Sequence, residues 1–302
     1  MLSKRIGFVD YRLDNFHADV YLSALRGPLA HRGYEVAGAT AIDTVVSADW
    51  ADGHDLPFYV ELAELADQVD CFVVLAPSNP ELHLGLCRDV FPFGKQTFVD
   101  KTFAPSIQIA KEIFALADQH GIAIQSTSAL RASAVPEAAS RGDSPLLGMF
   151  ITSSGPSFEE YGIHPVELAV SCLGAEVEGL MRLGSDDHPR FVLNFSGQRT
   201  AIIDFNQRGE VPFAATLVDA KGYRHVVVDD QSLFVDAAAS ILDFFDHGEA
   251  LIDRSETLAV RRILDVALQA ELTGKFLDLS GKTGPSNPVP APHWVGKKVQ
   301  QS

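Results

Sequence analysis

Residues 71–100 read CFVVLAPSNPELHLGLCRDVFPFGKQTFVD, and this stretch decides the fold. It contains two continuous apolar runs, at 71–76 and 96–100, separated by a helical pattern that ends at Gly94. Continuous rather than alternating apolar strands are typical of a parallel sheet that is buried on both faces. The stretch therefore predicts a strand–helix–strand unit of a doubly wound α/β fold.

The same alternation of strands and helices extends outward over residues 1–127. We expect these residues to form a Rossmann-like nucleotide-binding domain, in which ligands collect where the strands end. Its other predicted strands and helices lie, in chain order, at residues 5–9, 17–33, 34–40, 61–70, 106–121 and 122–127.

Residues 128–280 have a different pattern and form a second predicted domain, of the α+β class. A strand at 146–155 and a helix at 163–174 precede several strands in succession, which predicts an open antiparallel sheet with helices on one face. Lys221 and Gly222, between two of these runs, predict a hairpin turn. The remaining predicted strands lie at 177–184, 190–197, 199–209, 212–222 and 224–230, and the remaining helices at 234–248 and 255–274.

The last predicted helix has an apolar stripe, so we expect it to dock on the body of the protein. Residues 281–302 are rich in Pro, Gly and Lys and are expected to form a C-terminal surface arm. The stripe consists of Val260, Ile263, Leu264, Ala267 and Leu268.

The chain has 302 residues and a formal net charge of −16. Nucleic acid and anionic membranes would repel such a charge, so we expect neither as a partner, whereas a small molecule responds to local charge. No apolar run approaches the roughly 20 residues that span a bilayer, and the start MLSKR is no signal peptide, so a cytoplasmic protein is expected. Cys71, Cys87 and Cys172 lack metal-binding spacing and are expected to be buried free thiols.

The first strand runs into DYRLDNFH at residues 10–17, where a dinucleotide-binding domain would carry GxGxxG. Glycines there let backbone N–H groups approach a diphosphate at the N-terminus of the first helix. The three glycine positions are taken by Asp10, Arg12 and Asn15. Asp10 and Asp14 would place two carboxylates near a bound diphosphate, so this loop lacks the dinucleotide fingerprint.

The end of the second predicted strand also departs from that fingerprint. An acid is expected there to bind a ribose hydroxyl, but the residues are Ala39, Thr40 and Ala41, with Asp43 a little later. His17, at the start of the first helix, has two interpretations: a polar residue near an exposed helix end, or a group that faces the cleft.

Two further polar residues lie close to predicted strand ends. His83 opens the helix that follows the loop PSNP, as either a packing residue or a ligand-binding one. Lys101 follows a buried strand directly, beside Asp100 and Thr102, and burying an ammonium without partners is costly. It is either part of a salt-linked strand end or a cleft lysine that donates to a substrate oxygen.

His164 lies where a loop becomes an apolar helix, next to Gly162 and after Glu159 and Glu160. Histidine is the usual proton-transfer group near neutral pH, and a carboxylate about four residues earlier could hold its tautomer. The alternative is a histidine at a helix start that is capped locally.

Residues 73–104, VVLAPSNPELHLGLCRDVFPFGKQTFVDKTFA, resemble the Gfo/Idh/MocA oxidoreductases, named after glucose-fructose oxidoreductase, inositol dehydrogenase and rhizopine catabolism. The family has a strand, a Pro-containing loop, a His, a helix, Gly-Lys, a strand and Glu-Lys-Pro. The segment YGIHPVELAVSCLG resembles the family's Asp-x-Gly-x-His, with Glu160 at the Asp position and His164 at the His. The matching residues of the first segment are Pro77, His83, Gly94, Lys95, Asp100, Lys101 and Thr102.

This resemblance implies hydride transfer between NAD or NADP and a sugar, polyol or cyclitol, in a homo-oligomer formed through the antiparallel sheet. It implies that Lys101 hydrogen-bonds the reacting oxygen, that His164 is the general acid/base, and that Asp100 contacts the nicotinamide ribose. Further cofactor contacts are implied at Asp10, Tyr11, Arg12, Thr40, Ala76, Pro77, Ser78 and His83, substrate contacts at Lys101, Glu160 and His164, and no metal site.

The chain departs from the family at Asp100, Thr102 and Glu160, and in the missing glycines. Two alternatives therefore stay open. One is a redox-inactive family member that binds a sugar or nucleotide as a sensor or partner protein. The other is a cofactor-independent lyase or isomerase that uses the Lys/His pair for proton abstraction.

Overall fold

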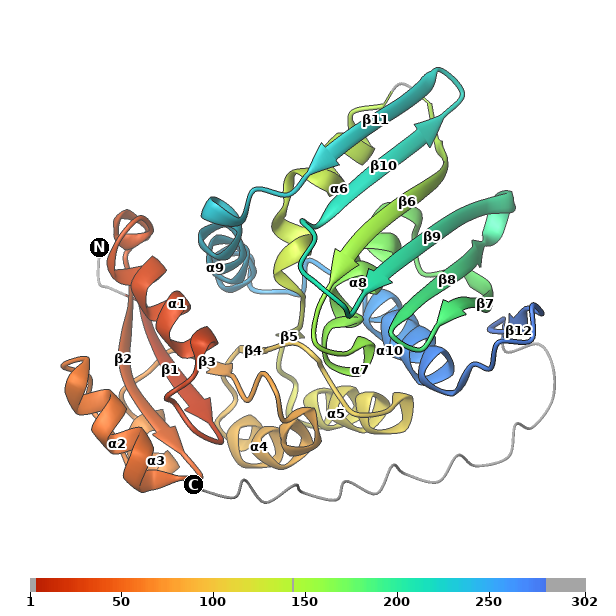
Figure 1. The fold of residues 1–302 in the computed structure, drawn as a ribbon. Coiled ribbons are helices and arrows are strands. Elements are labelled where there is room, and N and C mark those ends of the chain that lie inside the picture. Colours follow the sequence, from red (N-terminus) through yellow and green to blue (C-terminus); the bar gives the residue numbers. More distant parts are fainter. Residues whose placement is uncertain (1–3, 143, 281–302) are drawn as a thin grey trace, which may run out of the picture.

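The computed structural model describes residues 4–142 and 144–280, which form two sheets with helices around them (Figure 1). The strands of the first sheet are β1 (Lys4–Asp10), β2 (Tyr34–Ala41), β3 (Cys71–Val74), β4 (Thr97–Val99) and β5 (Ile124–Gln125). They are parallel and ordered β2-β1-β3-β4-β5. This confirms the predicted doubly wound domain.

Both faces of the first sheet are buried, because neighbouring side chains of one strand enter different apolar clusters. Phe8 of β1 packs in one cluster with α1 (Phe16–Arg26) and α2 (Thr44–Gly53), and Val9 packs in the other. The second cluster contains side chains of α3 (Leu62–Ala66), α4 (His83–Val90) and α5 (Ile107–His120). The continuous apolar runs in the sequence follow from this double burial.

Two details of this domain differ from the sequence-based expectation. The first helix ends at Arg26 rather than Gly33, because Gly27 caps it and Pro28 cannot continue it. Helix α2 was not predicted at all. Its buried face consists of Ser47, Trp50 and Ala51, which is too weakly apolar to give a helical periodicity.

The second sheet has seven strands in the order β11-β10-β6-β9-β8-β7-β12. Adjacent strands of this sheet are antiparallel, except that β6 and β9 are parallel to each other. The prediction of an open antiparallel sheet is therefore confirmed except at that pair. The strands are β6 (Leu146–Ser154), β7 (Val177–Ser185), β8 (His188–Phe195), β9 (Arg199–Asn206), β10 (Ala214–Asp219), β11 (Gly222–Val227) and β12 (Leu277–Asp278).

Helices join the two sheets into one body (Figure 1). Helix α8 packs on β6, α10 lies against both α8 and α5, and α9 lies against α1. An ion pair of 2.7 Å between Lys4 and Asp246 ties α9 to the first domain. The helices of this half are α6 (Ala134–Ser140), α7 (Phe158–Tyr161), α8 (Ile163–Leu173), α9 (Asp230–His247) and α10 (Arg254–Gln269).

The cysteines agree with the expectation of buried free thiols at two of the three positions. The three cysteines are free; Cys71 and Cys87 are buried, but Cys172 is only half-buried. No helix among residues 4–142 and 144–280 is long and apolar enough to cross a membrane. The predicted arm at 281–302 lies outside the described residues.

The α10 stripe provides a matched test of the packing. Leu264 is 2% exposed, whereas Leu268, at the edge of the stripe, is 43% exposed, which corrects the predicted burial of Leu268. We predict that Leu264→Ala lowers the free energy of unfolding by about 2–5 kcal/mol, because it leaves a cavity. Leu268→Ala should cost less than about 1 kcal/mol. Denaturant titrations measure both, and equal losses would contradict this packing.

Candidate active site

Asp100 leaves β4 as a fully buried carboxylate. Its N–H donates to the Val74 carbonyl, 2.8 Å away, which carries the sheet one residue past the strand end. One carboxylate oxygen lies 2.5 Å from Nδ1 of His17, and the other accepts a long hydrogen bond of 3.5 Å from the Tyr21 hydroxyl. Although burial opposes the charge, His17 and Lys101 hold the pKa of Asp100 below its usual value. His17 therefore pairs with the buried carboxylate at the end of β4, and whether its ring also faces a ligand stays a prediction.

Lys101 follows Asp100 and is also buried. Its Nζ donates to the carbonyl of Pro77, 3.1 Å away, in the loop that follows β3. An ammonium has three donors, and within the described part of the chain this is its one hydrogen bond. Two N–H groups therefore remain for a ligand. The peptide bond from Lys101 to Thr102 is cis.

His164 lies in the first turn of α8, half-buried between the rings of Tyr161 and Phe213. Its Nδ1 is 2.6 Å from the Ser128 hydroxyl. Burial, with the charges of Lys101 and His17, lowers the pKa of His164 to about 3, against a smaller opposing effect of Asp100. His164 and Lys101 thus share one electrostatic environment, although they come from different domains.

The partner of His164 differs from the expected one. Glu160, the carboxylate predicted to hold its tautomer, is exposed, and the hydrogen-bond partner of Nδ1 is Ser128, in the loop that follows β5. The sequence interpretation missed Ser128 because it lies 36 residues before His164. The polar run STSALR after an apolar strand was the one available signal.

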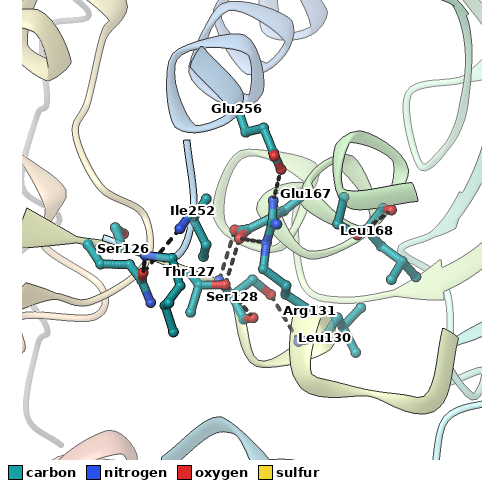
Figure 2. Close-up of polar contacts among 12 residues, drawn as sticks. Ser126, Thr127, Ser128, Leu130, Arg131, Glu167, Leu168, Ile252 and Glu256 are labelled. Atoms are coloured by element: carbon teal, nitrogen blue, oxygen red, sulfur yellow. Dashed lines mark hydrogen bonds and ion pairs between the residues drawn. The ribbon is translucent and has the colours of Figure 1, made fainter. Parts of the chain in front are cut away.

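A buried carboxylate holds the Ser128 loop in place (Figure 2). Glu167 of α8 accepts hydrogen bonds from the Thr127 hydroxyl at 2.7 Å and from the Ser128 N–H at 2.8 Å. Arg131 donates to Glu167 at 3.0 Å and to Glu256 of α10 at 2.5 Å. Burial raises the pKa of Glu167, and Arg131 opposes that rise. Through this network, α8 and α10 position the loop that contacts His164.

His83 is fully buried, and its two ring nitrogens face backbone carbonyls. Nε2 lies 2.7 Å from the oxygen of Leu75 and Nδ1 lies 3.1 Å from the oxygen of Phe103. The ring therefore joins the loops after β3 and β4 and offers no atom to a ligand. A direct cofactor contact by His83 does not fit this arrangement, and its interpretation as a packing residue does.

The loop after β1 forms an anion cradle, a set of backbone N–H groups that converge on one point. Oδ1 of Asp10 accepts hydrogen bonds from the N–H groups of Tyr11 at 2.6 Å, Arg12 at 3.2 Å and Ala76 at 3.0 Å. Its Oδ2 accepts from the Asn15 side chain at 2.9 Å. Burial raises the pKa of Asp10 to about 6, although each of these hydrogen bonds lowers it.

The chemical type of these donors suits the diphosphate of a dinucleotide, because backbone N–H groups that bind a carboxylate oxygen can also bind a phosphate oxygen. In this structure the chain's own carboxylate holds that place. The Arg12 guanidinium at the rim is exposed and paired with Asp14, at 2.5 and 2.8 Å. Asp43, the late acid after β2, caps α2 rather than facing a ribose.

The other predicted cofactor contacts lie near the cradle. Thr40 is buried near the end of β2, paired in register with Val9 of β1. Pro77 is half-buried and accepts the hydrogen bond from Lys101, and Ser78 beside it is exposed. Direct contacts of these residues with a cofactor stay predictions.

The fold and the site define a two-domain protein whose polar groups gather at the strand exits of a Rossmann domain. Residues 16–128 match the model of the Gfo/Idh/MocA oxidoreductase family, NAD-binding Rossmann fold. This match confirms the resemblance over the N-terminal domain. No curated protein sequence matches the chain.

Solved structures match nearly the whole chain. GenD2 from gentamicin A biosynthesis, in complex with NAD, has a TM-score of 0.77 and 14% identity over 92% of this chain and 97% of its own. A probable dehydrogenase from Thermotoga maritima has a TM-score of 0.77 and 14% identity, over 91% and 99%. A putative myo-inositol dehydrogenase from Sinorhizobium meliloti 1021 has a TM-score of 0.73 and 15% identity, over 92% of this chain and 100% of its own. At this identity the likeness establishes the two-domain fold.

The low pKa of His164 has a consequence for stability. The unfolded chain takes up a proton at this side chain near pH 6.5, whereas the folded chain does so only near pH 3, so stability falls as the pH falls between these values. Between pH 6.5 and about pH 4, we predict that the wild type loses on the order of 2 kcal/mol more than His164→Asn. Denaturant titrations across this range test it. His247→Asn, at an exposed site, is the control, and parallel curves for wild type and His164→Asn would contradict the low pKa.

Proposed function

We propose that this protein is an NAD(P)-dependent oxidoreductase that transfers hydride between a nicotinamide and the hydroxyl or carbonyl carbon of a sugar, polyol or cyclitol. The observation that carries the proposal is that Lys101 and Ile163, the residue before His164, line one cavity, and that the charge of Lys101 helps to lower the pKa of His164. The family match and the similarity to GenD2 and to a putative myo-inositol dehydrogenase support this substrate class.

Lys101 is proposed to bind the reacting oxygen of the substrate. Its two remaining N–H donors can stabilise negative charge that develops on that oxygen when a hydroxyl loses its proton. The hydrogen bond to the Pro77 carbonyl fixes the position of the ammonium. The nicotinamide, when bound, supplies or accepts the hydride.

His164 is proposed to act as a neutral imidazole. The Ser128 oxygen accepts the N–H of Leu130 and lies 2.6 Å from Nδ1 of His164, so its second lone pair can accept a hydrogen from Nδ1. In that tautomer Nε2 carries no hydrogen, and it would take the proton that a substrate hydroxyl loses when its carbon gives up hydride, and return it in the reverse reaction. The low pKa of the ring keeps it neutral before this transfer. Glu160, four residues before His164 in α7, stays a predicted substrate contact.

The cofactor is proposed to lie along the strand exits. The N–H groups of Tyr11, Arg12 and Ala76 would hold the diphosphate, once Asp10 gives up that place. Asp100 would accept a hydrogen bond from the nicotinamide ribose, as the resemblance implied.

The homo-oligomer is proposed to form through the open face of the second sheet. Phe150, Ile202, Val192 and Met181 lie in register on four neighbouring strands, β6, β9, β8 and β7. They alternate with buried residues such as Met149, so they occupy the face away from the core. Phe150 is 39% exposed. Such an apolar row on an exposed sheet face suits a symmetric interface.

A second candidate function is favoured by the Asp10 cradle. A redox-inactive protein that binds a sugar through Lys101 and His164 would have no need of a free diphosphate site. The two candidates differ in one property, which is whether any nicotinamide dinucleotide binds and changes its oxidation state.

Activity assays test the proposed chemistry. With a panel of sugars, polyols and cyclitols and all four nicotinamide dinucleotides, the wild type should show turnover by nicotinamide absorbance. Lys101→Ala and His164→Ala should each lower it by roughly 100-fold or more, because each removes a hydrogen bond to the reacting oxygen. Lys111→Ala, on the exposed side of α5, is the control. Turnover unchanged in Lys101→Ala would remove that residue from the mechanism, and dinucleotide binding without turnover would favour the redox-inactive candidate.

The oligomer proposal has a separate test. Phe150→Glu places a charge in the apolar row, so we expect it to shift the assembly to monomers in sedimentation velocity experiments. Val45→Glu, a comparable change at an exposed site on α2, should leave the assembly unchanged. A wild-type chain that sediments as a monomer would exclude this interface.

A further inference from the structure

We propose that Asp10 is a built-in competitor for the cofactor diphosphate, and that its carboxylate must leave the anion cradle before a dinucleotide binds. The inference rests on the proposed function, because it concerns the same cofactor. It goes beyond that function in assigning this side chain a role in setting cofactor affinity.

The first support is the geometry of the carboxylate. Asp10 is 1% exposed, and one of its oxygens accepts three backbone N–H groups from two loops, after β1 and after β3. Three amides directed at one oxygen form the arrangement that binds an oxyanion oxygen. A diphosphate oxygen and the Asp10 carboxylate cannot occupy this point together.

The second support is that the chain satisfies the neighbouring amides as well. Oδ1 of Asn15 accepts the N–H groups of His17 and Ala18 at the start of α1, at 3.0 and 3.2 Å. The N–H of Leu13 donates to the Ser47 hydroxyl at 3.1 Å. The N–H groups that would bind a diphosphate at this helix N-terminus thus already have partners. The net binding free energy of a ligand is therefore only the difference between its hydrogen bonds and the ones that it replaces.

The third support is the charge around the cradle. The cation nearest in sequence, Arg12, forms its ion pair with Asp14, so it does not neutralise Asp10. Asp43, after β2, adds a further negative charge near Arg12. Among residues 4–142 and 144–280 no cation pairs with Asp10, so its buried carboxylate repels a diphosphate in addition to blocking it.

Two substitutions separate blocking from repulsion. Asp10→Gly removes the side chain and frees the three amides. Asp10→Asn keeps an oxygen for them but removes the charge, and it serves as the second variant if the glycine form is unstable. Asp89→Asn, at an exposed site on α4, is the control for net charge. Thermal unfolding confirms that each variant is folded.

Isothermal titration calorimetry with NAD, NADH, NADP, NADPH and inorganic pyrophosphate, at one ionic strength, measures the affinities. Asp10→Gly should bind pyrophosphate and at least one dinucleotide at least tenfold more tightly than the wild type. Asp10→Asn should gain less than Asp10→Gly, and Asp89→Asn should stay within about threefold of the wild type. Asp10→Gly and Asp10→Asn that bind no tighter than the wild type, or that bind none of these probes, would overturn the proposal.

These outcomes are independent of the fate of the proposed function. A wild type that turns over with the same cofactor affinity as Asp10→Gly would refute the competitor and leave the oxidoreductase intact. Tight binding by Asp10→Gly, with a wild type that neither binds nor turns over, would support the competitor and refute the oxidoreductase.

Discussion

The whole site depends on how the chain stabilises carboxylates that it buries where the parallel strands end. Asp10 joins the loops after β1 and β3, Asp100 joins the end of β4 to α1, and Glu167 joins the loop after β5 to α8. A buried carboxylate is costly unless each oxygen has donors, so each of these groups restricts the loops that supply those donors. The positions of Lys101 and His164 follow from those restraints.

The three carboxylates differ in the groups that compensate their negative charge, and this difference affects their pKa values. Asp100 has a histidine and a lysine nearby and stays charged, whereas burial raises the pKa of Asp10 and of Glu167. Glu167 is balanced by Arg131, but the partners of Asp10 in the described part of the chain are neutral amides. At the proposed cofactor site the carboxylate charge of Asp10 is therefore weakly compensated, whereas near Lys101 the carboxylate charge of Asp100 has basic side chains close to it.

The sequence could predict most of the elements, though not α2, because strong apolar runs mark the buried strands and helices. Lys101 directly follows such a strand, and His164 lies where a loop becomes an apolar helix, so both could be named as candidates. It could not predict that Ser128 would contact His164, since that contact joins residues far apart in the chain through the tertiary packing of α8. Glu167 is a single acid in an apolar helix, so its sequence context does not indicate the loop that it binds. The missing glycines were visible at Asp10, but the turn of that carboxylate back onto three amides depends on the local backbone of two separate loops.

The most direct test of the account is a crystal structure of the protein grown with saturating reduced dinucleotide. The account predicts that the diphosphate lies on the amides of Tyr11, Arg12 and Ala76, that the Asp10 side chain has left them, and that the nicotinamide lies beside Lys101 and His164. A structure in which Asp10 still accepts those amides and no nicotinamide lies near Lys101 would contradict it.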